Sequence, residues 1–196
     1  MKEGVLLAGP AREVPLAAKL RFLFGGFYSQ FGWMWFGFSS IHLRLFLLGN
    51  SPFEWAMLAI LLFPVIGLAF IGVGLRKGLR GLRLLTRGIP ARGRLVHQQA
   101  TSTSINDRPV MAMTFEFQTV DGRGAKCVAL THETERLEDG ATEELVYDPE
   151  DPSVACLLDD LPGRPTIGDD GVVRLRDGGL PIHVLLPAGT LLMHLL

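Results

Sequence analysis

Cysteine is scarce in this sequence, with 2 residues among 196. Cys127 and Cys156 lie in apolar, strand-like runs. A small secreted domain held by disulfides needs more cysteines in a shorter chain. The scarcity therefore excludes a disulfide scaffold, and we expect both cysteines to be reduced and buried.

The spacings that fix a metal ion or a phosphate group are also missing. The 5 histidines form no His-x-x-His pair, and no Cys-x-x-Cys pair occurs. The glycine-containing run at 76–88 has no Gly-Lys-Ser/Thr ending. The same run is basic, but it directly follows an apolar segment and lacks interleaved aromatic residues. We expect no cofactor, no metal site, no nucleotide and no nucleic acid partner.

The nearest approach to an acid–base group is His132 with Glu133 and Glu135. Further carboxylates that could offer oxygen atoms to a hard cation are Asp148, Glu150 and Asp151. Asp-Pro turns, however, are common because Asp accepts hydrogen bonds from its own backbone and Pro fixes φ. We predict no catalytic residue, and an active site that uses His132, Glu133 and Asp148 remains an alternative.

Charge is unevenly distributed along the chain. The net charge of -1 hides a basic stretch at 76–94 and an acidic stretch at 133–151. Hydrophobic residues make up 48% of the sequence and crowd residues 20–85 and 180–196, while the region between has the composition of a soluble domain. A hydrophobic unit and a soluble unit are therefore expected in one chain.

Two long apolar runs predict transmembrane helices. Residues 22–41 contain no charged residue, and about 20 residues with a rise of about 1.5 Å each match a hydrocarbon core about 30 Å thick. The second run, residues 53–75, carries Glu54 only at its edge and is expected to kink at Pro64. Residues 22–75 thus predict a transmembrane helical hairpin. The alternative is a hairpin buried inside a soluble protein.

The flanking basic residues predict the orientation of this hairpin. Lys19 and Arg21 precede it, Arg44 alone lies between its helices, and the dense basic run follows it. Basic residues in short flanking segments prefer the cytoplasmic side. The N-terminal segment, residues 1–21, lacks the features of a cleaved signal peptide. We expect it to be cytoplasmic, together with the domain that follows the hairpin.

Four arginines in the predicted linker helix at 76–88 are candidates for contact with lipid headgroups. Arg76, Arg80, Arg83 and Arg87 are spaced 4, 3 and 4 residues apart, so a helix presents them on one face. Such a face suits the anionic inner leaflet. The alternative is a stop-transfer signal without a specific lipid. For packing between helices the candidates are Gln30, expected to bond to the second helix, and the small-residue pair Gly74 and Gly78.

Residues 89–160 predict a small β-domain. Alternation is clearest at 110–120, where Met111, Met113, Phe115 and Phe117 share one face. A turn at Asp121 and Gly122 leads to a second strand. The expected strands are residues 91–98, 110–120, 125–131, 143–147 and 154–158. Thr101 to Ser104 are expected to form a flexible hairpin loop. Five short antiparallel strands predict a small barrel or a curled sheet.

The last part of the chain divides into a polar linker, residues 161–179, and an apolar segment, residues 180–196, with Pro187 in its middle. The apolar segment has about the minimum length for a membrane span. A short third span, a re-entrant piece and an interfacial helix all fit, and we favour a membrane-embedded segment. The fold class expected overall is an α+β membrane protein.

Three segments of the β-domain resemble a known family. They are RGIPARGRLV at 87–96, MTFEFQTVDGR at 113–123 and ELVYDPEDPSVACL at 144–157. The sequence is similar over about residues 87–159 to the DUF3592 family, bacterial membrane proteins with a small β-domain of unassigned function. The most specific match is a strand that ends in Tyr-Asp-Pro followed by a second Asp-Pro, at Tyr147, Asp148, Pro149, Asp151 and Pro152. The resemblance implies this fold and the bacterial inner membrane, and it brings no catalytic residues.

These patterns favour a membrane-anchored interaction or scaffold protein, or an accessory subunit of a membrane complex. The cytoplasmic β-domain would be the docking module, and the expected partners are membrane lipids and other protein subunits. Two alternatives remain open. One is a membrane-bound enzyme or processing factor that uses the surface of the β-domain, and the other is a sensor of anionic lipid that uses the basic linker.

Overall fold

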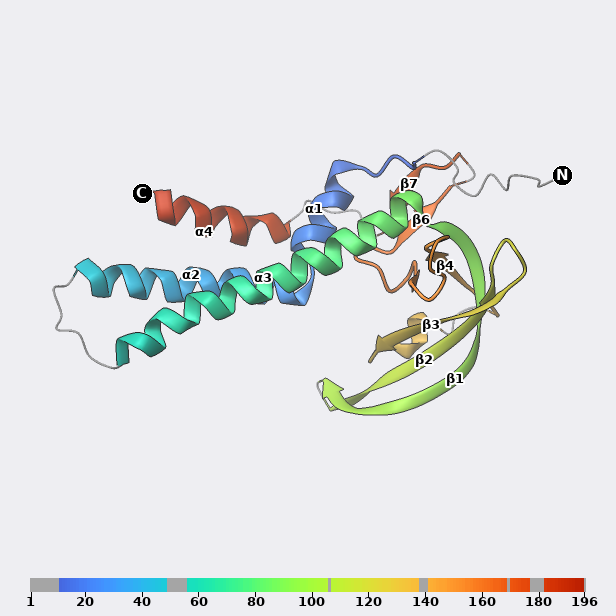
Figure 1. The fold of residues 1–196 in the computed structure, drawn as a ribbon, viewed down its shortest axis with the longest axis horizontal. Coiled ribbons are helices and arrows are strands. Elements are labelled where there is room, and N and C mark those ends of the chain that lie inside the picture. The colour runs from blue at the N-terminus through green and yellow to red at the C-terminus, as the bar shows by residue number, and fades with distance from the viewer. Residues whose placement is uncertain are drawn as a thin grey trace. The chain divides into compact units, whose positions relative to one another are not determined.

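The computed structural model describes residues 11–48, 56–105, 107–137, 141–168, 170–176 and 182–195. The chain divides into two compact units. The β-unit comprises residues 1–15 and 81–178, and the helical unit comprises residues 16–80 and 179–196. Helices form one unit and strands dominate the other (Figure 1). The α+β class expected from the sequence is therefore confirmed.

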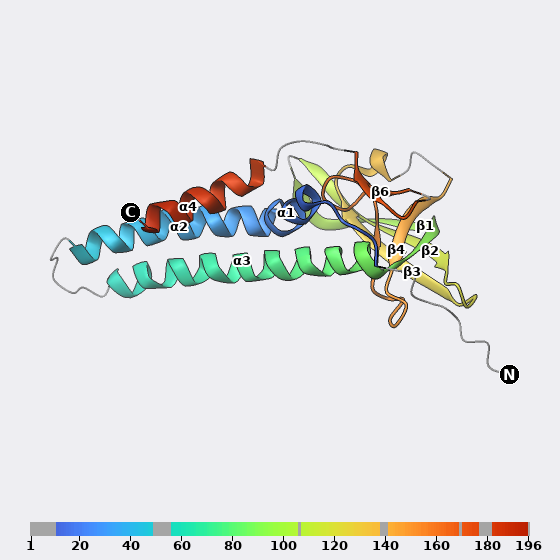
Figure 2. The same cartoon turned by 90° about the horizontal axis from the view of Figure 1, so that it is seen from above.

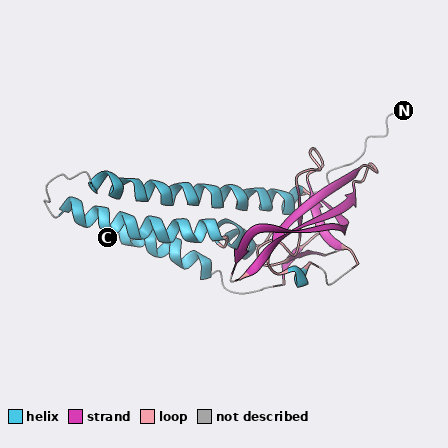
Figure 3. Ribbon diagram, turned by 90° about the horizontal axis from the view of Figure 1, so that it is seen from below, coloured by secondary structure: helices cyan, strands magenta, loops and turns pink. Residues whose placement is uncertain are grey.

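The described part of the β-unit contains a five-stranded antiparallel sheet in the order β3-β2-β1-β4-β5. Its strands are β1 (Ile89–Ile105), β2 (Arg108–Gln118), β3 (Gly124–Thr131), β4 (Glu143–Tyr147) and β5 (Ala155–Leu157). β1 pairs with β4 over residues 89–93 and with β2 from residue 94 onward. A single long strand thus joins both halves of the sheet, which curls strongly along it (Figure 3).

β1 is longer than predicted. Thr101 to Ser104, expected to form a loop, lie within β1 and extend the ribbon that it forms with β2. Thr101 Oγ1 also donates a hydrogen bond of 2.8 Å to the carbonyl oxygen of Val110. The loop prediction was wrong because the strand continues through a register shift at this polar segment and pairs with β2 again at Ser104 and Ile105. Its side chains contribute little to a core.

The core of the β-unit lies on the inner face of the sheet. β2 contributes Met113, Phe115 and Phe117, which are buried as the alternation predicts. The other buried members are Cys127, Ala129, Leu137, Leu145, Tyr147 and Leu157. Gly93 faces the same core at the point where β1 changes partner, and a Cβ atom there would lie 2.7 Å from Cδ2 of Leu145. The sheet therefore bends at Gly93, where no side chain fills the space between its two halves.

The two end strands of the sheet approach each other. The backbone of Leu157 in β5 forms a hydrogen bond with the Cys127 side chain in β3. No backbone ladder joins β3 to β5 among the described strands. The structure is therefore a curled sheet, and closure into a barrel stays a prediction.

The polar linker predicted at 161–179 contains a second, small sheet. β6 (Pro165–Ile167) pairs with β7 (Val173–Leu175) in an antiparallel hairpin. Gly171 adopts a φ of 73° in its turn, and the guanidinium of Arg174 binds the Asp170 carboxylate at 2.6 Å. The linker prediction missed these strands because each has only three residues, too few to show an alternating pattern.

The helical unit begins with two helices where the sequence predicts one. α1 (Leu16–Phe24) ends before α2 (Phe27–Leu48), and Gly25 and Gly26 lie between them. The continuous helix expected at 22–41 was wrong because two adjacent glycines weaken a helix, and here they interrupt it. α2 then runs beyond the predicted end and includes Arg44.

α3 (Ala56–Arg87) merges two predicted segments into one helix. The apolar span expected at 53–75 and the basic linker helix at 76–88 are continuous, and residues 53–55 lie outside the described residues. The helix passes through Pro64, Gly74 and Gly78 without ending. Its last residues, from Gly81 onward, belong to the β-unit.

One helix among the described residues, spanning 62–87, is long and apolar enough to cross a membrane. Within its apolar window 28% of the residues are buried inside the protein, so the helix is mostly exposed. A shorter apolar helix, α4 (Leu185–Leu195), follows a 3-10 turn at Ile182–Val184. A transmembrane hairpin of two helices stays a prediction.

α2, α3 and α4 pack through small residues in the helical unit (Figure 2). A Cβ atom at Gly32 would lie 2.6 Å from the backbone nitrogen of Ile71, and one at Gly37 would lie 2.9 Å from Thr190 Oγ1. His194 Nε2 lies 2.7 Å from Ser40 Oγ. The C-terminal helix therefore packs directly on α2.

A truncation of Phe115, which is fully buried in the β-unit, tests the described core. We expect Phe115→Ala to lower the free energy of unfolding by about 3–5 kcal/mol, because it removes a large buried side chain and leaves a cavity. The measurement is the urea concentration at which the buried Cys127 thiol becomes reactive. Val128→Ala is the matched control, since Val128 is 59% exposed on the outer face. Equal shifts in the two variants would contradict the described core.

Candidate functional site

The end of α3 is fastened to the N-terminal segment within the β-unit. The guanidinium of Arg12 donates hydrogen bonds to the carbonyl oxygens of Leu85 at 2.9 Å and Gly88 at 2.7 Å. The Arg12 backbone N–H donates to Thr86 O at 3.0 Å. A cation at the carbonyl end of a helix also opposes the partial negative charge there. Burial lowers the pKa of Arg12 from its ordinary value. This contact holds residues 81–88 against the chain that precedes α1.

The Asp-Pro turn that carries the family resemblance is held by its own side chains. Asp148 Oδ1 accepts a hydrogen bond of 3.0 Å from the backbone N–H of Glu150. Asp151 Oδ1 accepts from the backbone N–H of Ser153 at 3.1 Å and from its hydroxyl at 2.6 Å. The Asp148 N–H donates to Val154 O at 2.9 Å. With Pro149 and Pro152, these bonds fix the short connection between β4 and β5.

This turn meets the end of α3 through a charge pair. Arg83 Nη2 lies 3.8 Å from Asp148 Oδ2 and 3.8 Å from Glu150 Oε2. Arg83 and Glu150 are largely exposed, so each pair contributes little to stability. A pocket of about 310 Å³ lies here, and its lining includes Arg87, Gly88 and Pro149. Two of the predicted lipid-contacting arginines therefore lie at a mixed-charge pocket.

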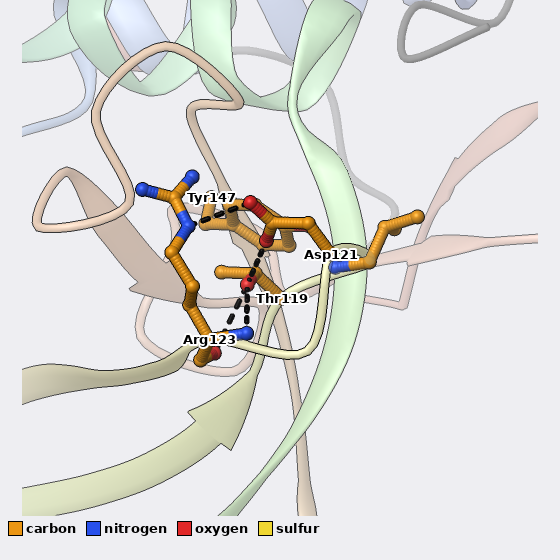
Figure 4. Close-up of polar contacts among 5 residues, drawn as sticks. Thr119, Asp121, Arg123 and Tyr147 are labelled. Carbon is orange, nitrogen blue, oxygen red and sulfur yellow. Dashed lines mark hydrogen bonds and ion pairs between the residues drawn. The ribbon is translucent and has the colours of Figure 1, made fainter. Parts of the chain in front are cut away.

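Tyr147, the first residue of the family motif, connects the core to the turn between β2 and β3 (Figure 4). Its hydroxyl accepts a hydrogen bond of 2.9 Å from the backbone N–H of Val120, and its ring packs 5.2 Å from that of Phe117. In the turn, the Thr119 hydroxyl hydrogen-bonds Asp121, and Arg123 Nε donates to Asp121 Oδ2 at 2.6 Å. The hydrogen bond from Thr119 holds the pKa of Asp121 below its ordinary value.

A larger hollow, of about 930 Å³, lies on the outer face of β1, β2 and β3. Its charged lining consists of Arg92 and Arg94 from β1, Glu116 from β2 and Lys126 from β3. Arg94 is opposite Glu116 in the strand register, and Glu116 is opposite Lys126. Lys126 Nζ binds Glu116 Oε1 at 3.0 Å. No local sequence pattern indicates this site, because its residues come together only through strand pairing.

The packing candidates in the helical unit lie at contacts between helices. A Cβ atom at Gly74 would lie 2.6 Å from the backbone nitrogen of Ser29, and Gly78 lies against the carbonyl group of Phe22. Gln30 does not bond α3 as expected. Its Nε2 donates to the carbonyl oxygens of Phe24 and His183, the latter at 2.8 Å. The prediction missed these partners because it did not foresee the break after α1 or the return of the C-terminal segment.

The alternative active site, made of His132, Glu133 and Asp148, does not come together in the structure. His132 follows β3, whose last residue, Thr131, pairs with Met111, which in turn pairs with Ala100 of β1. Asp148 follows Tyr147, which pairs with Ile89 at the other end of β1. The strand register thus separates His132 and Glu133 from Asp148. In the described ranges no three His, Cys, Asp or Glu side chains cluster as metal ligands would.

Cys127 is buried in the core and lies near Asp160. Burial, with a smaller contribution from the Asp160 carboxylate, raises the pKa of the Cys127 thiol from 9.0 to about 11, although a hydrogen bond from the Leu157 backbone acts in the opposite direction. The thiol therefore stays protonated at neutral pH. Cys156 is half-buried in β5.

Comparisons with known proteins return no relatives. No family model, no curated protein and no solved structure matches this chain. The resemblance to the DUF3592 family therefore stays a prediction.

The raised pKa of Cys127 predicts slow alkylation of the folded chain. At pH 8 its thiolate fraction should be roughly 100-fold below that of a thiol with its ordinary pKa, because only the thiolate reacts. N-ethylmaleimide labelling followed by peptide mass spectrometry measures the rate, with the same chain in urea as the reference. The contribution of the Cys127 thiol to the free energy of unfolding should fall as the pH rises above about 9, because the thiol of the unfolded chain loses its proton first. Equal alkylation rates for the folded and the unfolded chain would refute the burial of the Cys127 thiol.

Proposed function

We propose that α2 and α3 anchor this chain in a bacterial inner membrane and that its β-unit is a cytoplasmic docking module for another protein. The observation that carries the proposal is the apolar surface of the helical unit. Phe27, Phe38 and Leu45 of α2 are 71%, 66% and 64% exposed. Val65 and Leu68 of α3 are 59% and 52% exposed. A contiguous apolar surface is costly in water and stable in lipid.

Helix length supports two spans. α2 has 22 residues and α3 has 32, and about 20 suffice to cross the hydrocarbon core. α4 has 11 residues, too few to cross on its own. Its contacts with α2 support an embedded third segment that accompanies α2 through part of the bilayer. Closure of the sheet into a small barrel, and membership of the DUF3592 family, belong to the same proposal.

Basic residues support the orientation. Lys19 and Arg21 precede α2, and the arginines from Arg76 onward follow the apolar part of α3, whereas Arg44 is near the opposite end of the hairpin. The positive-inside rule then gives a cytoplasmic N-terminus and a cytoplasmic β-unit. Reduced cysteines agree with that compartment.

A docking role is supported by the character of the β-unit. A hollow of about 930 Å³ lies on the outer face of the sheet and presents four charged side chains. The strand register places His132 and Glu133 level with one end of β1 and Asp148 level with the other. A surface that presents fixed charges, without converging acid–base groups, suits binding better than catalysis. The partner is a protein subunit of the same membrane, to which this chain is an accessory subunit or scaffold.

A second candidate function, sensing of anionic lipid, is favoured by the basic face of α3. Arg76, Arg80, Arg83 and Arg87 are all exposed, and they share one face of a helix that continues from the apolar segment. Each cation near an anionic leaflet contributes about 1 kcal/mol to binding.

Acidic residues on the exposed face of α3 test the anchor. We expect Val65→Asp/Leu68→Asp to release much of the chain from membranes, because each carboxylate at mid-membrane depth costs about 2.5–3.5 kcal/mol. The measurement is the fraction that stays in the membrane pellet after alkaline carbonate extraction. Val128→Asp, on an exposed position of the β-unit, is the control and should stay bound. Retention of both variants would argue against lipid around α3.

Native mass spectrometry in mild detergent tests both candidate functions. Docking predicts a stoichiometric protein partner on the chain released from its own membranes, and a bare monomer would count against it. Lipid sensing predicts bound phosphatidylserine or phosphatidylglycerol that is lost in Arg76→Glu/Arg80→Glu. Unchanged lipid binding in that variant would exclude the basic face of α3 as a sensor.

A further inference from the structure

We infer that the hollow on the outer face of β1, β2 and β3 binds a carboxylate-bearing segment of a partner protein, with Arg92 and Arg94 pairing with its acidic side chains. The inference rests on the proposed docking function and adds to it the place and the chemistry of the contact. It begins from two arginines that form no ion pair within the described residues.

Arg92 and Arg94 point to the same side of β1. Residues two apart on a strand share a face and are roughly 7 Å apart. Gly93 between them faces the core, where Leu145 Cδ2 and Phe115 Cβ fill the space of its missing side chain. Both arginines are exposed, on the face of β1 opposite the core. Neither has an ion-pair partner within the described part of the chain.

The rest of the lining leaves the hollow with an excess of positive charge. Lys126 pairs with Glu116 at 3.0 Å, so the single carboxylate of the lining is already neutralised. Two positive charges of the lining remain, on Arg92 and Arg94. Glu144, outside the lining, is opposite Arg92 in the strand register, so the local excess is one positive charge. Guanidinium groups bind carboxylates through two parallel hydrogen bonds, which fixes direction as well as charge. An acidic side chain is therefore the complementary group.

The shape and the uncharged lining favour a peptide segment over other anions. The hollow measures about 930 Å³, far more than one ion occupies, and the exposed side chain of Val96 gives it an apolar wall. A flat headgroup layer does not reach the floor of a concave surface, whereas a protruding chain does. Stacking of nucleic acid bases requires exposed rings, and Phe117 in the lining is only 4% exposed.

The full-length chain in phosphatidylcholine nanodiscs tests the inference with a defined probe. The probe is a fluorescein-labelled peptide of alternating glutamate and alanine, and its control replaces glutamate with glutamine. Fluorescence anisotropy gives the Kd. We expect binding of the glutamate peptide only, weakened roughly tenfold by R92Q/R94Q and by high salt. Equal binding of both peptides would overturn the inference.

Matched variants separate the hollow from general charge and from misfolding. R108Q removes an exposed arginine at the start of β2, outside the hollow, and should leave the Kd unchanged. R92K/R94K keeps both charges but loses the paired hydrogen bonds, so its Kd should lie between those of the wild type and R92Q/R94Q. The Cys127 thiol should stay unreactive in each variant if the sheet is folded. A loss in R108Q or R92K/R94K as large as in R92Q/R94Q would overturn the inference.

Two further results distinguish this inference from the proposed function. If short-chain phosphatidylserine displaces the peptide from the wild type, the hollow takes lipid headgroups and the inference fails. If the native partner stays bound to R92Q/R94Q in mild detergent, docking stands but occurs elsewhere, and the inference again fails. A wild-type chain that carries no partner at all would instead contradict the proposed function.

Discussion

The exchange of partners along β1 is the constraint on which the β-unit depends. One strand pairs first with β4 and then with β2, and the change falls at Gly93. Leu145 and Phe115, from the two partner strands, meet where a side chain at this position would be. A larger residue there would push the two halves of the core apart. The same bend sets which residues of β1 face outward, so the core and the charged hollow have a common origin.

Glycine has a corresponding role in the helical unit. Gly32, Gly67 and Gly74 let the backbones of α2 and α3 approach closely, and Gly37 leaves room in α2 for the Thr190 side chain of α4. Close backbone contact uses dispersion forces, which act in lipid as they do in water. Because the packing relies on small residues, many large apolar side chains remain on the outside. This arrangement suits helices that are surrounded by hydrocarbon.

The balance of charge differs between the pocket at the end of α3 and the hollow on the sheet. At the end of α3, Arg83 lies near two carboxylates of the Asp-Pro turn, while Arg12 is used to hold the helix end. On the sheet, Lys126 pairs with Glu116, whereas Arg92 and Arg94 form no ion pair within the described residues. A pocket with balanced charge has little preference for an anion, whereas the hollow has a clear one. The docking proposal therefore centres on the sheet.

The sequence by itself determined the elements whose pattern is local. Alternation at residues 110–117 located β2 and its buried face, and the apolar runs located most of α2 and α3. Only the tertiary structure decided the rest. The strand at Thr101 to Ser104 depends on the pairing with β2 that resumes at Ser104 after a register shift. The hydrogen bonds of Gln30 depend on the return of the C-terminal segment, and Arg92, Arg94 and Lys126 meet through strand register. Local patterns record which face of an element is apolar, but residues distant in sequence become neighbours only when the backbones pair.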